Sequence, residues 1–440
     1  MLACALLLVS GAAGAADAVP VPLPEINARV DAVAARVVEW RRDIHQHPEL
    51  ANRESRTGAL VAAHLKQLGL EVREGVAHTG VVGVLRGAKP GGVVALRADM
   101  DALPVAEATG LPFASTATAT YDGATVPVAH ACGHDAHTAM LMGAAEVLSG
   151  LKSELNGTIV FLFQPAEEGA PAGERGGASL MIDEGALADP APEAVFGLHV
   201  VPGAPGSIFY RPEGFMAAAD QIHITLRGKQ THGAWPWKGI DVISLASAVV
   251  SELNTLAART VDVTATPTVL TIATIHGGVR YNIIPEELVM TGTLRTFDKE
   301  QRTQIKERIE QTVTNLAASY GARAEVKFGA SGAVTWNDPA LSRSVFSALE
   351  EAAGAGNVDM NRRPTTVSED FSAYQKRIPG VFYHMGASAA GTDPEASAPN
   401  HSPQFDVKEA VLPVGVRAHV LTALPLARGA VSGRGSVPRR

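Results

Sequence analysis

Two stretches, GVVALRAD at 92–99 and GTIVFLFQ at 157–164, decide the fold of this chain. Each is as long as a single β-strand, is mostly apolar and ends on a polar side chain. Strands that are apolar on both faces are typical of the middle of a parallel sheet covered by helices. Between them, DAHTAMLMGAAEVLSG at 135–150 predicts a helix with Asp135 as its N-cap. The order strand, helix, strand therefore predicts an α/β fold with a mostly parallel sheet.

The pattern changes after about residue 208 and returns after about residue 330. In between, the predicted elements follow the order strand, helix, strand, strand, helix, strand, which is typical of a ferredoxin-like domain. We therefore expect a larger α/β domain in two parts, 19–208 and 330–427, interrupted by a smaller domain at 209–329. A length of 440 residues fits this division, because a single domain core rarely serves more than about 250–300 residues.

The two ends of the chain differ in composition from its body. Residues 1–18 are apolar and rich in small residues, with an A-x-A-type site near Ala13–Ala15, which predicts a signal peptide and export to the periplasm or the medium. Residues 428–440 are rich in Gly, Ser and Arg, which predicts a disordered tail.

Charge and hydropathy exclude two classes of partner. The formal net charge is −8 and no basic stripe runs through the body of the chain, so nucleic-acid binding is not expected. No segment after the N-terminal one has 18 uninterrupted apolar residues, so no membrane span is expected either.

The segment HACGHDAH at 130–137 gathers three histidines and a cysteine. The chain has two cysteines, and Cys4 lies in the predicted signal peptide, so the mature protein cannot form an internal disulfide. Cys132 and His134 are two residues apart in a predicted extended loop, where alternation puts both side chains on one side. A thiolate and an imidazole suit Zn²⁺ and similar divalent ions. His130 or His137 could serve in place of His134.

Other polar groups follow the ends of predicted core strands or lie in later loops, where open α/β sheets place their sites. They are Asp99 and Asp101 in LRADMDALP, Glu167 and Glu168 in FQPAEEG, His199 in GLHV and His401 in APNHSP. One glutamate of the pair can bind a metal while its neighbour acts as a base, and Asp99 can orient a ligand imidazole. Thiol, imidazoles and paired carboxylates on one sheet predict metal-assisted hydrolysis.

Six motifs occur in one order along the chain: RADMDALP, HACGHDAH, FQPAEEG, FGLHV, YNIIP…GTLRTF and SEDFS. With them the sequence resembles the M20 metallopeptidase family, and most closely its amidohydrolase branch of hippurate, N-acyl-amino-acid and indole-acetyl-amino-acid hydrolases. The resemblance runs from residue 41 to residue 412. It implies that the smaller domain is a lid or dimerisation domain, and that the chain cleaves the amide bond of N-acyl or N-aroyl amino acids.

Carried over position by position, the resemblance implies two divalent ions, Zn²⁺, Mn²⁺ or Co²⁺. Their ligands would be Cys132, His134, Glu168, His199 and His401. Cys132 would bridge the ions, and Glu167 would be the general base that takes a proton from the attacking water. In the smaller domain, His232 would polarise the scissile carbonyl. Asn282 and Arg295 would bind substrate, with Arg295 on its carboxylate.

The chain departs from the branch in one place. Where the branch usually has GGHGAxPH, this chain reads KQTHGAWPW, so Trp237 replaces a histidine and Trp235 is added. The two tryptophans could form an apolar wall for an acyl group, or pack in a hinge or dimer surface. The resemblance also implies a homodimer through the smaller domain, in which His232 acts on the metals of the partner subunit.

Three alternative functions remain at this point. The same machinery fits a metallo-carboxypeptidase or dipeptidase that acts on small peptides. Cysteine hydrolysis with Cys132 as nucleophile is a second reading, but it leaves the paired glutamates and His401 without roles. The third is a non-catalytic metal- or ligand-binding homologue, against which the retention of Glu167 and all five ligands argues.

Overall fold

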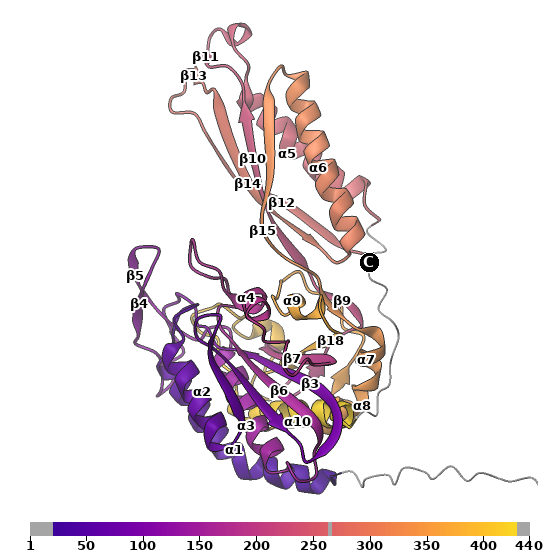
Figure 1. Cartoon of the computed structure of the whole chain (residues 1–440). Helices are drawn as coiled ribbons and strands as arrows, with labels where there is room; N and C mark the ends of the chain where they lie inside the picture. Colours follow the sequence, from indigo (N-terminus) through magenta and orange to yellow (C-terminus); the bar gives the residue numbers. More distant parts are fainter. Residues whose placement is uncertain (1–20, 263–265, 429–440) are drawn as a thin grey trace, which may run out of the picture.

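The computed structural model describes residues 21–262 and 266–428. The predicted signal peptide 1–18 lies outside these residues, and so does the predicted tail 428–440 apart from Arg428. The described chain forms two lobes, with the inserted elements standing on top of a larger α/β lobe in the view of Figure 1.

An eight-stranded sheet forms the middle of the larger lobe, in the order β1-β2-β6-β3-β7-β18-β8-β17. Its strands are β1 (Glu71–Val76), β2 (Gly80–Arg86), β3 (Lys89–Asp99), β6 (Asn156–Gln164), β7 (Ala194–Val201), β8 (Ile208–Phe209), β17 (Val358–Asp359) and β18 (Gly380–Gly386). The four central strands β6, β3, β7 and β18 are parallel, which confirms the mostly parallel sheet. At the edges β1, β2 and β6 pair antiparallel, and so do β18 and β8.

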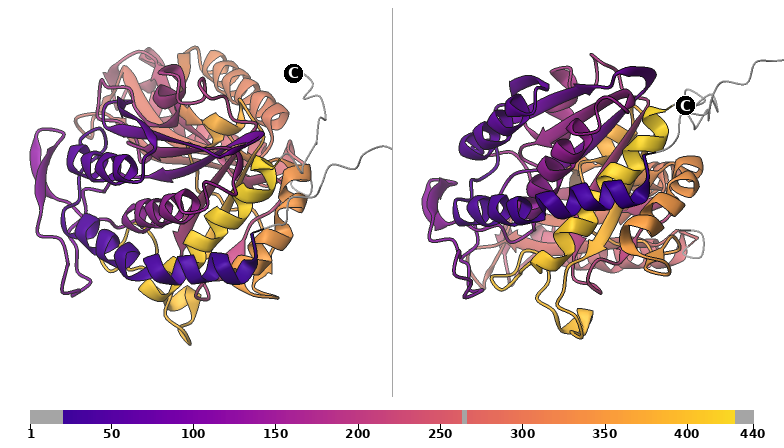
Figure 2. Two further views of the ribbon diagram at one scale, coloured as in Figure 1. Left: turned by 60° about the horizontal axis from the view of Figure 1, so that its bottom comes forward. Right: turned by 90° about the horizontal axis from the view of Figure 1, so that it is seen from below.

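Both faces of the central strands are buried, as their apolar sequences predict. Ile159, Phe161 and Phe163 of β6 belong to the large core under α1 (Leu23–Gln46), α3 (His134–Ser149) and α10 (Leu412–Ala427). The alternate residues Val160 and Leu162 belong to a second core on the other face, with α4 (Gly177–Asp183) and α9 (Ser372–Gln375). Figure 2 shows α1, α3 and α10 lying side by side over one face of the sheet.

Helix α3 begins differently from the prediction. Its N-cap is Gly133 with φ 95°, and His134 is its first residue, so Asp135 is not the cap. A Cβ at position 133 would lie 2.3 Å from Val200 Cγ2, which is why a glycine stands there. Asp135 instead accepts hydrogen bonds of 2.8 Å from Arg41 Nε and His45 Nδ1 of α1.

The smaller lobe is a four-stranded antiparallel sheet in the order β12-β14-β10-β15, with two helices. Its elements are β10 (Ala218–Arg227), α5 (Val242–Arg259), β12 (Thr268–Gly277), β14 (Glu287–Thr296), α6 (Lys299–Ser319) and β15 (Arg323–Gly332). Their order along the chain is the one predicted from the sequence. Ile222, Ile224 and Leu226 alternate along β10 into a separate core under α5 and α6. Asp241 and Asp298 cap the two helices.

Two short antiparallel strand pairs mark the two ends of the smaller lobe. The strands β9 (Glu213–Met216) and β16 (Thr335–Asn337) pair antiparallel where the chain enters and leaves the smaller lobe. At the far end of that lobe, β11 (Thr231–His232) pairs with β13 (Ile283–Ile284). The remaining elements are α2 (Ser55–Gln67), β4 (Thr118–Tyr121), β5 (Ala124–Pro127), α7 (Pro339–Ser344), α8 (Phe346–Ala353) and the 3₁₀ turns Pro236–Lys238, Pro394–Ala396 and Glu409–Val411.

Among the described residues, one helical stretch has the length and composition of a membrane span, Glu409–Ala427, with a mean hydropathy of 1.5 in its most apolar window. Most of it is α10, and 67% of that window is buried inside the protein. Packing against β3, α1 and α3 accounts for its apolar character.

Candidate active site

The predicted site residues of the larger lobe meet at one edge of the central sheet, beyond the carboxyl ends of its parallel strands. Asp99 ends β3, Glu167 and Glu168 follow β6, and His199 lies near the end of β7. A cavity of about 530 Å³ opens there. Its lining includes Cys132, Glu167, Glu168, His199 and His401.

Two groups of candidate metal ligands share Cys132. In one, the donor atoms of Cys132, His134 and His199 all lie within 4.8 Å of one another, with Cys132 Sγ 3.4 Å from His199 Nε2. In the other, Cys132 lies with Glu168 and His401, and His401 Nε2 is 2.9 Å from Glu168 Oε1. The shared thiol therefore occupies the position from which one ligand can contact two ions.

The loop that carries His401 is fastened to the loop of Cys132. The backbone N–H of His401 donates to Ala131 O at 2.7 Å. The side-chain amide of Asn400 donates to Cys132 O at 3.0 Å and to Val200 O at 3.1 Å. These hydrogen bonds hold His401 beside the carboxyl end of β7 and the start of α3, although it is far from both in the sequence.

The surroundings of these donors fit divalent cations. His134 Nε2 is buried and has no hydrogen-bond partner among the described residues. Burial raises the pKa of the Cys132 thiol, and Glu168 adds to this, so a thiolate here calls for positive charge from a bound ion. Thiolate, imidazole and carboxylate are the ligands that Zn²⁺ and related ions accept.

Two aspartates of the RADMDALP segment hold different histidines. Asp101 Oδ1 lies 3.2 Å from His134 Nδ1, and Asp101 Oδ2 accepts the backbone N–H of Glu168 at 3.0 Å. Asp99, which the sequence favoured as the partner of a ligand imidazole, lies 2.6 Å from His137 Nδ1 and 3.8 Å from His134 Nε2. His137 Nε2 accepts the N–H of Val200 at 2.8 Å, so both its nitrogens are engaged in hydrogen bonds. Asp101, and not Asp99, therefore makes the hydrogen bond that orients the candidate ligand His134.

Glu167 lies in a strongly acidic part of the cavity. Burial and the charges of Glu369 and Glu168 raise its pKa well above the ordinary value. The fully buried Arg97 offsets some of this charge, because its guanidinium contacts Glu369 Oε1 at 2.9 Å and Asp370 Oδ1 at 3.1 Å. A carboxylate with a raised pKa is a stronger base and suits proton abstraction near neutral pH.

Glu54 is a residue that the sequence did not indicate. It is fully buried, and its Oε1 accepts the backbone N–H of Ala166 at 2.9 Å and that of Asn52 at 3.1 Å. Ala166 has a left-handed φ of 53°, immediately before Glu167. Glu54 therefore holds the turn that aims Glu167 into the cavity. It stands in the polar run NRES, which gives no signal of such a role.

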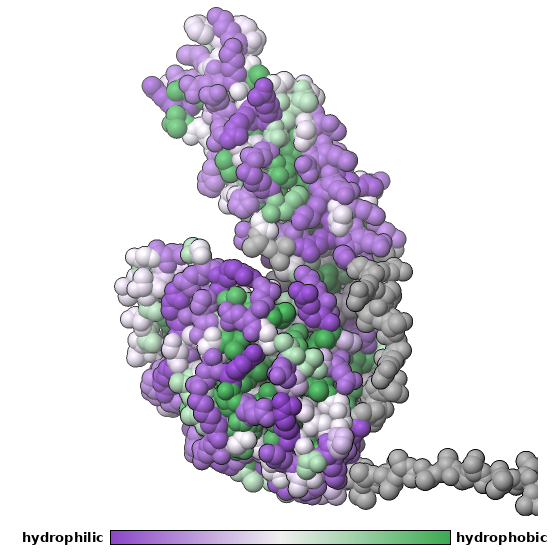
Figure 3. Space-filling view, viewed as in Figure 1, coloured by the Kyte–Doolittle hydropathy of each residue, from purple (hydrophilic) through white to green (hydrophobic). Residues whose placement is uncertain are grey.

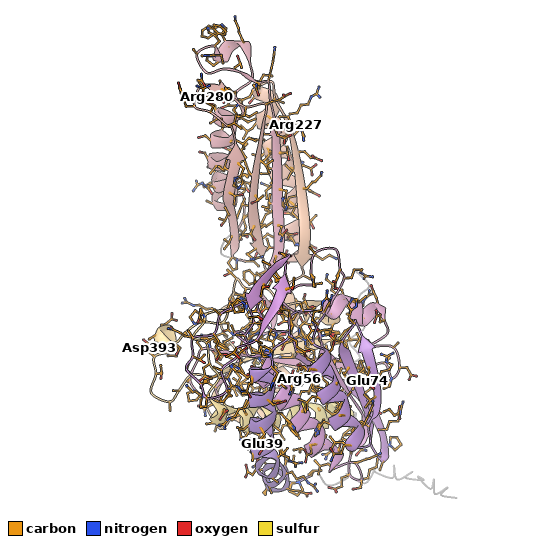
Figure 4. All side chains as sticks on the ribbon, turned by 90° about the vertical axis from the view of Figure 1, so that its left-hand side faces the viewer. Glu39, Arg56, Glu74, Arg227, Arg280 and Asp393 are labelled. Atoms are coloured by element: carbon orange, nitrogen blue, oxygen red, sulfur yellow. The ribbon has the colours of Figure 1, made fainter. Side chains whose placement is uncertain are left out.

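The three predicted residues of the smaller lobe lie elsewhere. His232 is exposed in β11, and Asn282 is beside it, because Gly233 N donates to Asn282 O at 2.8 Å. Both are at the far end of the lobe from the central sheet, near the labelled Arg280 of Figure 4. Arg295 is half-buried in β14, opposite Ala219 of β10. None of the three is among the described residues that line the cavity.

The chain matches proteins of known family along most of its length. The model of peptidase family M20/M25/M40 matches residues 95–424. "Thermostable carboxypeptidase 1" of Saccharolobus solfataricus is 38% identical over 391 residues, covering 88% of this chain and 94% of the relative. "IAA-amino acid hydrolase ILR1-like 4" of Arabidopsis thaliana is 38% identical over 393 residues, covering 88% and 84%.

A solved structure matches over the same extent. The YXEP protein of Bacillus subtilis, described as a dinuclear metal-binding peptidase of the M20 family, superimposes with a TM-score of 0.74 at 32% sequence identity. The match covers 90% of this chain and 99% of that one. The chain therefore belongs to peptidase family M20/M25/M40, and it is a hydrolase of amide or peptide bonds.

Proposed function

We propose that this chain is a binuclear-metal amidohydrolase that cleaves the amide bond of N-acyl or N-aroyl amino acids. The observation that carries the proposal is the position of Cys132, which is shared by two groups of donors and has Glu167 nearby. Cys132, His134 and His199 would hold one ion, and Cys132, Glu168 and His401 the other. The described dinuclear site of the YXEP protein supports a pair of ions.

Bound Zn²⁺, Mn²⁺ or Co²⁺ would supply Lewis acidity and activate water as a nucleophile. A carboxylate oxygen of Glu167 takes a proton from the attacking water and delivers it to the leaving nitrogen. The negative charges of Glu369 and Glu168 raise the proton affinity of Glu167. The positive charge of Arg97, which contacts Glu369, balances part of the negative charge of this cluster.

His232 is suited to polarise the scissile carbonyl. Its Nδ1 accepts the backbone N–H of Ala234 at 3.0 Å, which leaves Nε2 to carry the proton of the neutral ring. Nε2–H can then donate to a carbonyl oxygen. Because His232 is at the end of its lobe away from the cavity of its own chain, we propose that it serves the cavity of a second copy.

The smaller lobe would then be both a lid and a dimerisation domain. A homodimer with two-fold symmetry brings each lobe to the cavity of the other subunit. Asn282 lies beside His232 and would enter the same cavity. Arg295 is at the opposite end of the lobe, across from Ala219 and next to β9, so it would pair with the free carboxylate of an amino acid in the cavity of its own chain.

The names of two relatives support two types of substrate, N-acyl amino acids and peptides, and both types carry a free carboxylate. The Arabidopsis thaliana relative is an IAA-amino acid hydrolase, and the Saccharolobus solfataricus relative is a carboxypeptidase. Hydrolysis of small peptides from their C-terminal end is therefore the second candidate, and rates on N-acyl amino acids and on dipeptides separate the two.

Export to the periplasm or the medium is the proposed location. The apolar, small-residue-rich segment 1–18 supports it. Sequencing the N-terminus of the protein recovered from the cell exterior should find it cleaved near residue 15. Recovery of the full-length chain in the cytosol alone would contradict export.

A panel assay on chelated and reloaded protein tests the activity. We expect the metal-free protein to be inactive and to recover with Zn²⁺, Mn²⁺ or Co²⁺. It should cleave hippurate, N-acetyl or indole-acetyl amino acids faster than dipeptides. Full activity with metal content measured as zero would exclude the proposed chemistry. Faster cleavage of every peptide than of every N-acyl amino acid would favour the carboxypeptidase.

A further inference from the structure

The far end of the smaller lobe exposes several large side chains. We call this surface the tip, residues 231–238 and 279–284. Its exposed members are Trp235 at 50%, Trp237 at 74%, Val279 at 91% and Tyr281 at 92% of their areas. In Figure 3 most of this lobe is hydrophilic, with a small hydrophobic area at the end that carries β11 and β13. Exposed apolar groups gathered in one place indicate a surface that is covered in the working assembly.

Trp235 is fixed beside His232. The two ring centroids are 5.3 Å apart, and Lys238 Nζ lies 4.6 Å from the centroid of the Trp235 ring. A carbonyl oxygen held by His232 Nε2–H would therefore lie within reach of the indole. The substituent on that carbonyl carbon is the acyl group of the substrate, so Trp235 is placed to contact it. Trp237 lies two residues further along the same loop.

The cavity of the larger lobe offers the opposite wall. Phe209, Phe215 and Met216 are among its lining residues, and the rings of Phe209 and Phe215 pack on His384, whose ring centroid is 6.0 Å from that of His199. The cavity volume of about 530 Å³ exceeds the need of an acetyl group. Its charged lining includes Arg362 and Arg363 as well as four carboxylates, so its apolar side chains, and not its net charge, match the exposed apolar tip. The tip of the same chain contributes no residue to this lining, so the partner that receives the tip is a second copy of this chain, as the proposed function requires.

We propose that Trp235 and Trp237 form one wall of an acyl-binding subsite in the cavity of the partner subunit, which selects aromatic or long apolar acyl groups over acetyl. The inference rests on the proposed function, because it requires amide hydrolysis with His232 acting across a dimer. The inference adds the class of acyl group to that function. It assigns the choice of acyl group to Trp235 and Trp237, the two residues at which the chain departs from the usual motif.

The test compares two substrates with the same leaving group, hippurate (N-benzoylglycine) and N-acetylglycine. In the double variant Trp235→Ala/Trp237→Ala, the ratio of kcat/KM for hippurate to that for N-acetylglycine should fall roughly tenfold or more. Trp235→Phe, which keeps an aromatic face, should preserve the ratio within about threefold. Trp336→Ala removes a tryptophan of similar exposure outside the tip, and it should leave the ratio unchanged.

Sedimentation of each variant shows whether the dimer persists. If the double variant does not assemble, the single variants Trp235→Leu and Trp237→Ala test the same ratio. An equal loss of kcat/KM on both substrates, or an unchanged ratio, would overturn the acyl wall while leaving the proposed hydrolysis intact. Wild-type protein that cleaves neither substrate nor any other N-acyl amino acid would instead refute the proposed function, and the inference with it.

Discussion

Glu167 and Glu168 are neighbours in sequence, and their pKa values shift in opposite directions. Burial and the nearby Glu369 raise the pKa of Glu167. Burial would also raise that of Glu168, but a hydrogen bond from His401 and the charge of His134 hold it below its ordinary value. The first environment suits a proton acceptor, and the second suits an ionised ligand.

Substitution of each glutamate should separate the two roles. Glu167→Gln should lower kcat by about 10²–10⁴-fold and leave the metal content unchanged, because only the base is lost. Glu168→Gln should reduce the metal content, because one donor of the Cys132–Glu168–His401 group is weakened. Turnover and metal content measured on the same preparations check both expectations, and the opposite pattern would mean that the pair is assigned the wrong way round.

Glu54 is the residue through which the fold aims Glu167. Glu54→Ala should lower kcat by about 10- to 100-fold with unchanged metal content and KM, because the turn at Ala166 loses the acceptor of its N–H. Burial and the charge of Asp101 raise the pKa of Glu54 to about 7, so a neutral side chain is tolerated there. Glu54→Gln keeps an acceptor oxygen and should restore most of the activity. Equal damage in both variants would argue against positioning.

Among the helices and strands, those strands that are apolar on both faces could be predicted, because burial on two sides leaves no polar alternation. Strands of two to four residues, such as β8, β9 and β17, could not, since they are too short to carry a period. The start of α3 also differed, because the close approach of Val200 demands Gly133 at the cap. Cys132 and His134 still converge, but through a left-handed glycine and a helix start instead of an extended loop.

Helices α1 and α3 are joined by a buried ionic contact whose strength depends on pH. His45 Nδ1 is 2.8 Å from Asp135 Oδ2, and His45 Nε2 is 3.1 Å from Glu107 Oε1. Burial alone would lower the pKa of His45, but the charge of Asp135 and the hydrogen bonds to Asp135 and Glu107 raise it to about 9. Because the folded value exceeds the ordinary 6.5, the stabilisation is fully present below pH 6.5 and is lost as pH rises through 9.

The variant His45→Gln should therefore be destabilised more at pH 6 than at pH 10. The difference in free energy of unfolding between wild type and variant should shrink by about 3 kcal/mol over this range. Denaturant unfolding at both pH values measures it, and a difference that stays constant or grows with pH would contradict a charged His45 in the fold.

For the molecule as a whole, the sequence predicted which residues of the larger lobe lie together at the cavity. It did not predict every contact that brings them together. Cys132, His134, Glu167, Glu168 and His199 follow strand ends or helix starts of one sheet, so topology alone brings them together. His401 joins through the bonds of Asn400, which no local pattern encodes. The place of His232 in the smaller domain predicted its separation from this cluster, whereas local periodicity carries no information on how β9 and β16 join the lobes.

The position of His232 leads to a prediction about the assembled protein. If His232 serves the partner subunit, two inactive variants can repair each other. His232→Ala and Glu167→Ala, unfolded and refolded together in equal amounts with metal, should recover roughly a quarter of wild-type activity. Random two-fold pairing makes about half of the dimers mixed, and each mixed dimer has one intact site.

The matched control mixes Glu167→Ala with His199→Ala, whose lesions both lie in the larger lobe. Every site in that mixture keeps a lesion whichever subunit supplies His232, so no activity should return. Mass spectrometry of the intact assemblies establishes that mixed dimers have formed in both experiments. If they have and the first mixture remains inactive, His232 works within its own subunit, and the smaller lobe must then swing about β9 and β16 to bring it to the cavity. Recovery in the first mixture alone would place each active site between two chains.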